Sequence, residues 1–202
     1  MENQDQMTAE RSLEIIQQSI RQGRKDVTRQ IALPMLWWGA LDMLTALVVG
    51  HLWAHNGGPV WNLLWFAMTV IGFIGQYFII RKQGPMPSNV ISKMVGSIWL
   101  SFCLLTLSVT ISIYVAAMMG ALKVDFPLSA VIILLMSLSC SIMGMVLQHG
   151  AMTGGGLAAG IIFSGFCVSF PGPYEMVAIA LTALFTLIMP AAIILYVTRK
   201  KQ

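Results

Sequence analysis

The sequence predicts an all-α integral membrane protein: a bundle of six transmembrane helices, arranged as three hairpins and preceded by a cytoplasmic amphipathic helix. Three observations lead to this class. Hydrophobic residues make up 57% of the chain. Only 10% of the 202 residues are Asp, Glu, Lys or Arg, too few to coat a soluble particle of this size. Six apolar stretches are each long enough to cross a bilayer, which takes about 20 residues.

Residues 1–30 are predicted to form the cytoplasmic N-terminal segment, with an amphipathic helix over residues 8–30 and Thr8 as its N-cap. Apolar residues recur on one stripe of this helix, and Gly23 is expected to mark a bend. We expect the helix to lie on the anionic inner leaflet, with contacts from Leu13, Ile16, Ile20, Arg21, Arg24, Lys25 and Val27. Binding of a protein partner through residues 8–30, or self-association of the chain, is the alternative.

Residues 31–202 are predicted to form the membrane domain, with spans at about 34–54, 60–80, 95–119, 127–148, 151–170 and 174–198. Each even-numbered span begins near a proline, which suits the first turn of a helix: Pro59, Pro127 and Pro173. The fifth span is the least typical, because it opens with Thr153 and three glycines. Pro190 is expected to kink the sixth span.

The distribution of basic residues predicts the orientation. With six spans, eleven of the twelve Lys and Arg residues fall on the side that holds both termini, and Lys123 alone falls on the other. Lys and Arg accumulate in cytoplasmic loops, so we expect a multi-pass protein of the inner (plasma) membrane with both termini in the cytoplasm. Because the basic residues flank apolar runs, the net charge of +4 indicates lipid contact and no nucleic-acid partner.

Asp42 is the only carboxylate deep within a predicted span. Placing its charge there costs several kcal/mol unless it is paired, protonated or hydrated. No predicted span contains a Lys or Arg that could pair with it. We therefore expect a neutral acid that donates a hydrogen bond to a neighbouring helix, and proton or cation handling is the functional alternative.

Small and hydroxyl residues form stripes at helical spacing on three spans. Small residues let membrane helices approach closely and form interhelical hydrogen bonds. We expect Gly144, Gly156, Gly160 and Ser164 to pack helices together. A polar cluster or transport path, if one exists, would contain Asp42, Ser97, Ser101, Ser108, Ser137, Ser141 and Gln148.

Other reactive side chains give no catalytic pattern. His51 and His55 share one helical face, but His149 is predicted on the opposite membrane surface, so no metal site is expected. The three cysteines fall within spans and are expected to fill space. The chain has no phosphate-binding loop, nucleophile elbow or metalloprotease motif, and we expect neither enzymatic activity nor a cofactor.

Three segments carry a family resemblance: Thr8 to Ile16 in the polar lead, the Trp37-Trp38-Gly39 opening of the first span, and Ile193 to Lys201 at the end. With the compact six-span body between them, the chain resembles a group of small uncharacterised bacterial inner-membrane proteins. The resemblance implies this architecture and transfers no activity or functional residue. We expect a non-enzymatic membrane protein of regulatory, scaffold or assembly type, with a small transporter or channel that uses Asp42 as the alternative.

Overall fold

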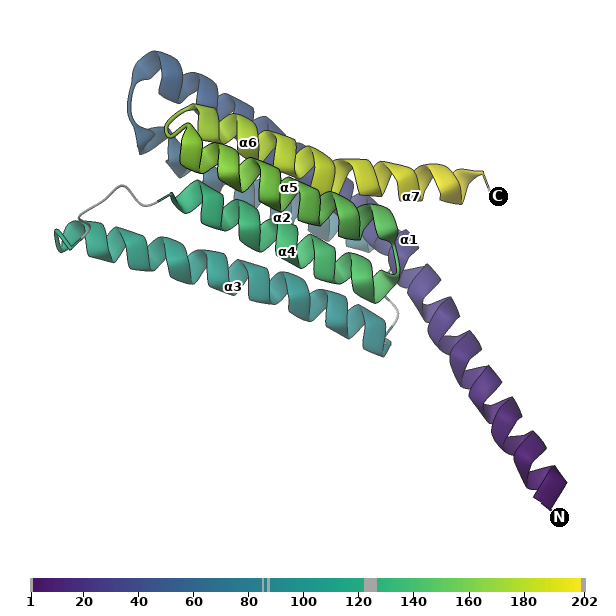
Figure 1. Cartoon of the computed structure of the whole chain (residues 1–202). Coiled ribbons are helices and arrows are strands. Elements are labelled where there is room, and N and C mark those ends of the chain that lie inside the picture. Colours follow the sequence, from purple (N-terminus) through teal and green to yellow (C-terminus); the bar gives the residue numbers. More distant parts are fainter. Residues whose placement is uncertain (1, 85, 87, 122–126, 201–202) are drawn as a thin grey trace.

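The computed structural model describes residues 2–84, 86, 88–121 and 127–200, and the side chains from residue 11 onward except that of Pro59 (Figure 1). Every regular element in these residues is a helix, and six helices are long and apolar enough to cross a membrane. The prediction of an all-α chain with six candidate spans is therefore confirmed. Lys123 and Lys201 lie outside the described residues.

The helices follow one another with short connections: α1 (Glu2–Asn56), the 3-10 helix η1 (Pro59–Leu63), α2 (Leu64–Gln83), α3 (Val90–Met118), α4 (Leu128–Leu147), α5 (Gly150–Ser169), α6 (Tyr174–Ala183), the π-helical turn η2 (Leu184–Ile188) and α7 (Met189–Arg199). The segment from α6 through η2 to α7 forms the sixth candidate span. Prolines begin η1 and precede α4 and α6, as predicted. The glycine-rich opening of α5 is helical from Gly150.

The first helix differs most from its prediction. α1 runs without a break from Glu2 to Asn56, so residues 1–30 and the first span are not separate helices, and Thr8 lies inside α1 and not at its N-cap. Pro34 is accommodated within this helix. Its neighbours Ile31, Ala32 and Met35 are buried in the bundle core, and this packing holds the helix where the proline removes a backbone donor.

The helices pack into a bundle with two hydrophobic clusters. The most extensive interface joins α4 to α5, and α1 packs mainly against α6, α7 and α2. These interfaces cross the predicted hairpin boundaries, so the contacts do not divide the bundle into three hairpins. One cluster contains Val27, Ile31 and side chains of α3, α4 and α7, and the other contains Ala46, Val49 and side chains of α4 and α6.

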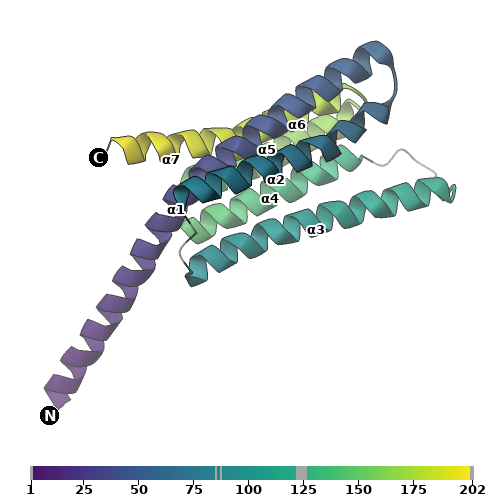
Figure 2. The same cartoon turned by 180° about the vertical axis from the view of Figure 1, so that it is seen from behind.

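Both chain ends lie at one end of the bundle, which we call the terminal end; the α1–η1 connection lies at the opposite end (Figures 1 and 2). Below the bundle, the first part of α1 extends away from all other helices. Gly23 lies beside Asn89, the residue that caps α3: an added Cβ would lie 3.0 Å from the side-chain amide nitrogen of Asn89. We call residues 2–22 of α1 the arm.

Candidate functional site

The stripes of α4 and α5 meet in a narrow seam. A Cβ added to Gly156 would lie 2.8 Å from the carbonyl oxygen of Ser137, and one added to Gly160 would lie 2.9 Å from the Cβ of Ser137. The Ser141 hydroxyl lies within this seam, donating to Ser137 O at 2.8 Å and to Thr153 O at 3.3 Å. Ser137 and Ser141 are both buried. This arrangement holds two helices in close contact and leaves little room for a ligand.

The remaining predicted packing residues lie on the same two helices. Gly144 faces α5, where an added Cβ would lie 2.9 Å from the Cβ of Met152. Ser164 is partly buried and donates to the carbonyl of Gly160 in its own helix. Thr153, which the sequence did not single out, supplies the carbonyl oxygen that accepts the hydrogen bond from the Ser141 hydroxyl. Its position one turn before Gly156 and two turns before Gly160 was the available signal.

The polar cluster predicted between α3, α4 and α5 does not form. Ser97, Ser101 and Ser108 are exposed. The side of α3 that packs against the core carries Ile91, Val95, Ile98, Trp99 and Phe102 instead. Lipid is as apolar as the bundle core, so van der Waals packing of these bulky side chains, and not their hydrophobicity, decides which face of α3 turns inward. Gln148 is also exposed, since it ends α4 in a left-handed conformation with φ of 54°.

Asp42 lies on the inward side of α1. Gly39, three residues earlier, touches η2, and Ala46, four residues later, is fully buried. The Oδ2 atom of Asp42 is buried and has no hydrogen-bond partner among the described residues. The expected hydrogen bond from Asp42 to a neighbouring helix is therefore not present. Of the predicted polar residues, Ser137, Ser141 and Asp42 lie inside the bundle.

The π-helical turn faces Asp42's helix on one side and α4 on the other. Pro190 has no N–H to donate to the carbonyl of Thr186 four residues earlier. This carbonyl instead accepts the Sγ–H of Cys140 at 3.0 Å. Thr186 and Thr182 are fully buried, and each hydroxyl donates to a carbonyl of its own helix. Cys140 thus does more than fill space, and its position beside the Thr186 carbonyl of another helix could not be predicted from spacing within its own segment.

The sixth span changes direction at this turn, since α6 and α7 are inclined to each other (Figure 1). A proline inside a membrane helix commonly produces such a bend. The predicted kink near Pro190 therefore takes the form of the π-turn η2, which comes just before it.

Two tryptophans fasten α2 to α1. Trp37 donates its indole N–H to the carbonyl of Gly72 at 3.1 Å, and Trp38 donates to the Gln76 side chain. Both rings lie against glycines of α2, Gly72 and Gly75, where no side chain intervenes. This contact positions the part of α1 that carries Asp42.

The arm presents the predicted surface residues in two groups. Leu13, Ile16 and Ile20 are exposed, with 59%, 58% and 49% of their surface accessible. Arg21 and Lys25 are exposed as well, whereas Arg24 is partly buried and its Nε has no hydrogen-bond partner in the described chain. Val27 is fully buried, so it belongs to the bundle core and is closed to a membrane surface.

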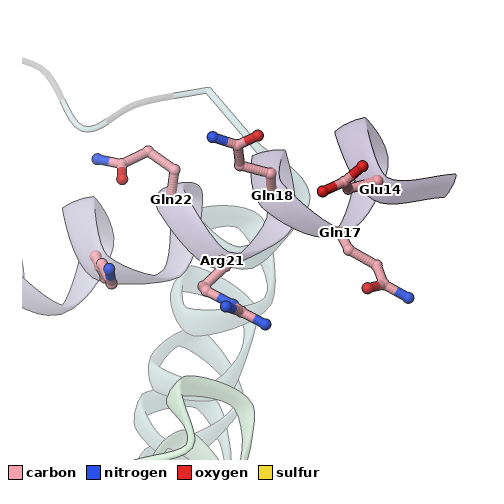
Figure 3. Close-up of a pocket in the computed structure, with 6 residues that line it drawn as sticks. Glu14, Gln17, Gln18, Arg21 and Gln22 are labelled. Atoms are coloured by element: carbon pink, nitrogen blue, oxygen red, sulfur yellow. The ribbon is translucent and has the colours of Figure 1, made fainter. Parts of the chain in front are cut away.

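A shallow hollow follows the arm and is lined by six polar or charged side chains: Glu14, Gln17, Gln18, Arg21, Gln22 and Lys25. All six belong to one helix. Figure 3 shows Gln18 and Gln22 on one side of this helix and Gln17 and Arg21 on the other. The side chains diverge, so they do not form a site that could enclose a small molecule.

The titratable residues do not assemble into a metal site. The rings of His51 and His55 lie near the opposite end of the bundle with centroids 4.2 Å apart and planes tilted by 34°, while His149 lies between α4 and α5 at the terminal end. No group of three or more His, Cys, Asp or Glu side chains comes together in the described residues. Burial lowers the pKa of His149, and a backbone hydrogen bond partly opposes this effect.

Comparisons of the chain with models of protein families, with curated proteins and with solved structures found no significant match.

Proposed function

We propose that this chain is a non-enzymatic module of the bacterial inner membrane, of regulatory, scaffold or assembly type, whose bundle anchors the arm. One observation carries the proposal: residues 11–22 project from the bundle as a helix whose apolar side chains pack against nothing in the described chain. Six membrane helices hold its base, because Val27, Ile31 and Met35 are buried among α3, α4 and α7. Such a helix is suited to docking.

We place both termini in the cytoplasm. Support comes from the position of the basic residues. The described Lys and Arg residues lie in the first part of α1 or near the ends of α2, α3 and α7 at the terminal end of the bundle: Arg11, Arg21, Arg24, Lys25, Arg29, Arg81, Lys82, Lys93, Arg199 and Lys200. Cytoplasmic segments of inner-membrane proteins carry such an excess. On this orientation the arm lies beside the anionic inner leaflet.

The docking surface that we favour is this leaflet. Leu13, Ile16 and Ile20 would enter the interface between headgroups and acyl chains, and the nearby Arg21 and Lys25 would contact anionic headgroups. Each basic residue near such a surface contributes about 1 kcal/mol. A protein partner, or the arm of a second copy, would use the same apolar residues and would depend less on lipid charge.

The transporter alternative draws less support from the geometry. A path past Asp42 would need further polar side chains that face it. The hydroxyls of Ser97, Ser101 and Ser108 lie on the outside of α3, and Ser137 and Ser141 lie in the close-packed seam with α5.

Hydrogen exchange of the full-length protein in nanodiscs tests the proposed docking. We expect amides of residues 11–22 to exchange at least tenfold more slowly in discs with phosphatidylglycerol than in discs with phosphatidylcholine alone, because docking protects the helix. The variant Arg21→Glu/Lys25→Glu should lose this difference. The matched variant Arg81→Glu/Lys82→Glu, which alters charges at the end of α2 instead, should keep it. Equal exchange in both lipids would refute lipid docking.

A further inference from the structure

The seat of Asp42 is a close contact between α1 and the sixth candidate span. A Cβ added to Gly39 would lie 2.8 Å from the Cβ of Leu187, and one added to Gly50 would lie 2.9 Å from the Cβ of Met176. These two contacts fix an antiparallel register in which Asp42 lies level with the junction of α6 and η2. At 1.5 Å per residue, Asp42 is about 4.5 Å along the helix axis from the Gly39 contact.

Small side chains surround this level. Ala46 on α1 and Ala180 and Ala183 on α6 are all buried, with exposed fractions of at most 4%. Such residues let two helices approach closely. Asp42 is half-buried at this level, and its Oδ2 atom is buried with no hydrogen-bond partner in the described chain.

No ionised side chain of the described helices is placed to balance a charge on Asp42. Among the helices that contact α1, the titratable groups away from the terminal end are Tyr77 on α2, Cys103 and Tyr114 on α3, Cys140 on α4 and Glu175 on α6. Cys103 and Tyr114 are exposed, and so are His51 and His55, which lie two turns or more beyond Asp42 on α1. Tyr77 is exposed, Cys140 donates to Thr186 O, and Glu175 accepts from the Gly172 N–H beyond the start of α6. An anion at Asp42 would therefore have no counter-charge nearby, whereas a neutral acid needs none.

A second buried oxygen without a hydrogen-bond partner in the described residues, the Ser137 hydroxyl, lies at a similar depth in the bundle. Cys140 of α4 is level with Thr186, because its thiol donates to that carbonyl. The helix α4 runs toward the terminal end, so Ser137, three residues before Cys140, lies about one turn farther from that end than Thr186. The helix α1 runs the other way, so Asp42, three residues after Gly39, lies about one turn farther from the terminal end as well. The Ser137 Oγ, like Asp42 Oδ2, is buried without a partner in the described residues. The π-turn, a feature frequent at functional sites, begins at the same level.

We propose that Asp42 is a reversible proton-binding site in the middle of the bundle, and that its occupancy controls the packing of α1 against α6. The carboxylate takes a proton from a hydronium ion of the aqueous phase, forming the O–H bond and leaving a water molecule. The neutral acid fits between Ala180 and Ala183. Loss of the proton leaves an unpaired anion in this seat, which favours separation of α1 from α6 and entry of water.

Infrared spectroscopy of the full-length protein in liposomes tests this assignment. A protonated carboxylic acid has a C=O stretching band separate from that of a carboxylate. We expect the wild type to show this band at acidic pH, to lose it reversibly as the pH rises, and to shift it when aspartate carboxyls are labelled with carbon-13. Asp42→Asn should lack the band. Glu175→Gln, which removes the acid in the first turn of α6, should retain the band.

Hydrogen exchange gives the second readout. After division by the intrinsic exchange rate at each pH, amides of residues 176–183 should be less protected once the band has disappeared. Asp42→Asn should show no such loss of protection, because its side-chain amide carries no charge at either pH. If that variant fails to fold, carbon-13 aspartate labelling of Asp5→Asn/Asp26→Asn/Asp125→Asn, in which Asp42 is the one remaining aspartate, assigns the band instead. The proposal is overturned if the wild type lacks the band at every pH, if the band persists at every pH, or if at constant pH its loss follows sodium concentration.

Discussion

At the residue scale, the glycines of α5 fall into two groups according to what lies opposite them. Gly156 faces the Ser137 carbonyl and the Ser141 backbone nitrogen, which a Cβ would approach to 2.8 and 3.0 Å. Gly154 has no atom within 4 Å of its Cβ position. We expect Gly156→Ala to lower the free energy of unfolding by about 1–3 kcal/mol, since backbone atoms cannot move aside. Gly154→Ala, the control, should leave it unchanged or raise it. Thermal unfolding in detergent measures both, and equal effects would refute the close seam.

His149 gives the protein a residue-scale response to acid. Because burial lowers the pKa of His149 in the folded state, the unfolded chain binds a proton more tightly than the folded one. Its contribution to stability is therefore complete above its ordinary pKa of 6.5 and is lost as the pH falls through the lowered value. The Nδ1 atom is buried without a partner in the described chain, so protonation adds an unsatisfied donor.

We therefore expect acidification from about pH 7 to about pH 5 to lower the melting temperature of the wild type relative to that of His149→Gln. His55→Gln alters an exposed ring at the opposite end of the bundle and should follow the wild type. Parallel pH profiles for all three proteins would show that His149 titrates alike in the folded and unfolded states.

At the scale of the elements, the sixth span combines a proline, a π-turn and a thiol. Cys140 donates to the Thr186 carbonyl, and Pro190 supplies no N–H to the same carbonyl. In Pro190→Ala, the new backbone N–H should take over this acceptor. Cys140→Ala should then cost about 0.6 kcal/mol less in the Pro190→Ala background than in the wild type, the mean for an interhelical hydrogen bond. A double-mutant cycle measures this coupling, and the change in side-chain volume cancels in it. A coupling energy of zero would mean that the Cys140 contact contributes nothing.

The elements also show which structural features the sequence determines locally. Hydropathy located the six candidate spans, and the prolines located the starts of η1, α4 and α6, because both depend on residues within a single segment. The orientation of α3 was not predictable in this way. Its serines and its bulky apolar side chains each form a regular stripe, and only the surface offered by α4 and α1 decides which stripe is buried.

The same limit applies to α1 and to Asp42. The change from polar to apolar composition near residue 31 suggested a boundary, but a helix can continue through such a change when its far part packs well. Asp42 was found from its charge within an apolar stretch, whereas its seat opposite Ala180 and Ala183 depends on the register that Gly39 and Gly50 set with residues more than a hundred positions away. Side-chain partners across the bundle are products of packing.

At the scale of the whole molecule, the arm, the basic residues that the structure describes and both ends of the chain share one end of the bundle. An even number of crossings requires both ends to lie on one side of the membrane, and the positive charges predict the cytoplasm. A reporter that fluoresces only in the cytoplasm should be active when fused after residue 200 and silent when inserted between residues 121 and 127. The basic residues are the physical cause, so replacing Arg81, Lys82 and Lys93 with Gln should reduce the fraction of chains in this orientation. A silent C-terminal fusion that is stably produced would contradict a six-span chain with its termini inside, and would assign the arm to the other face of the membrane.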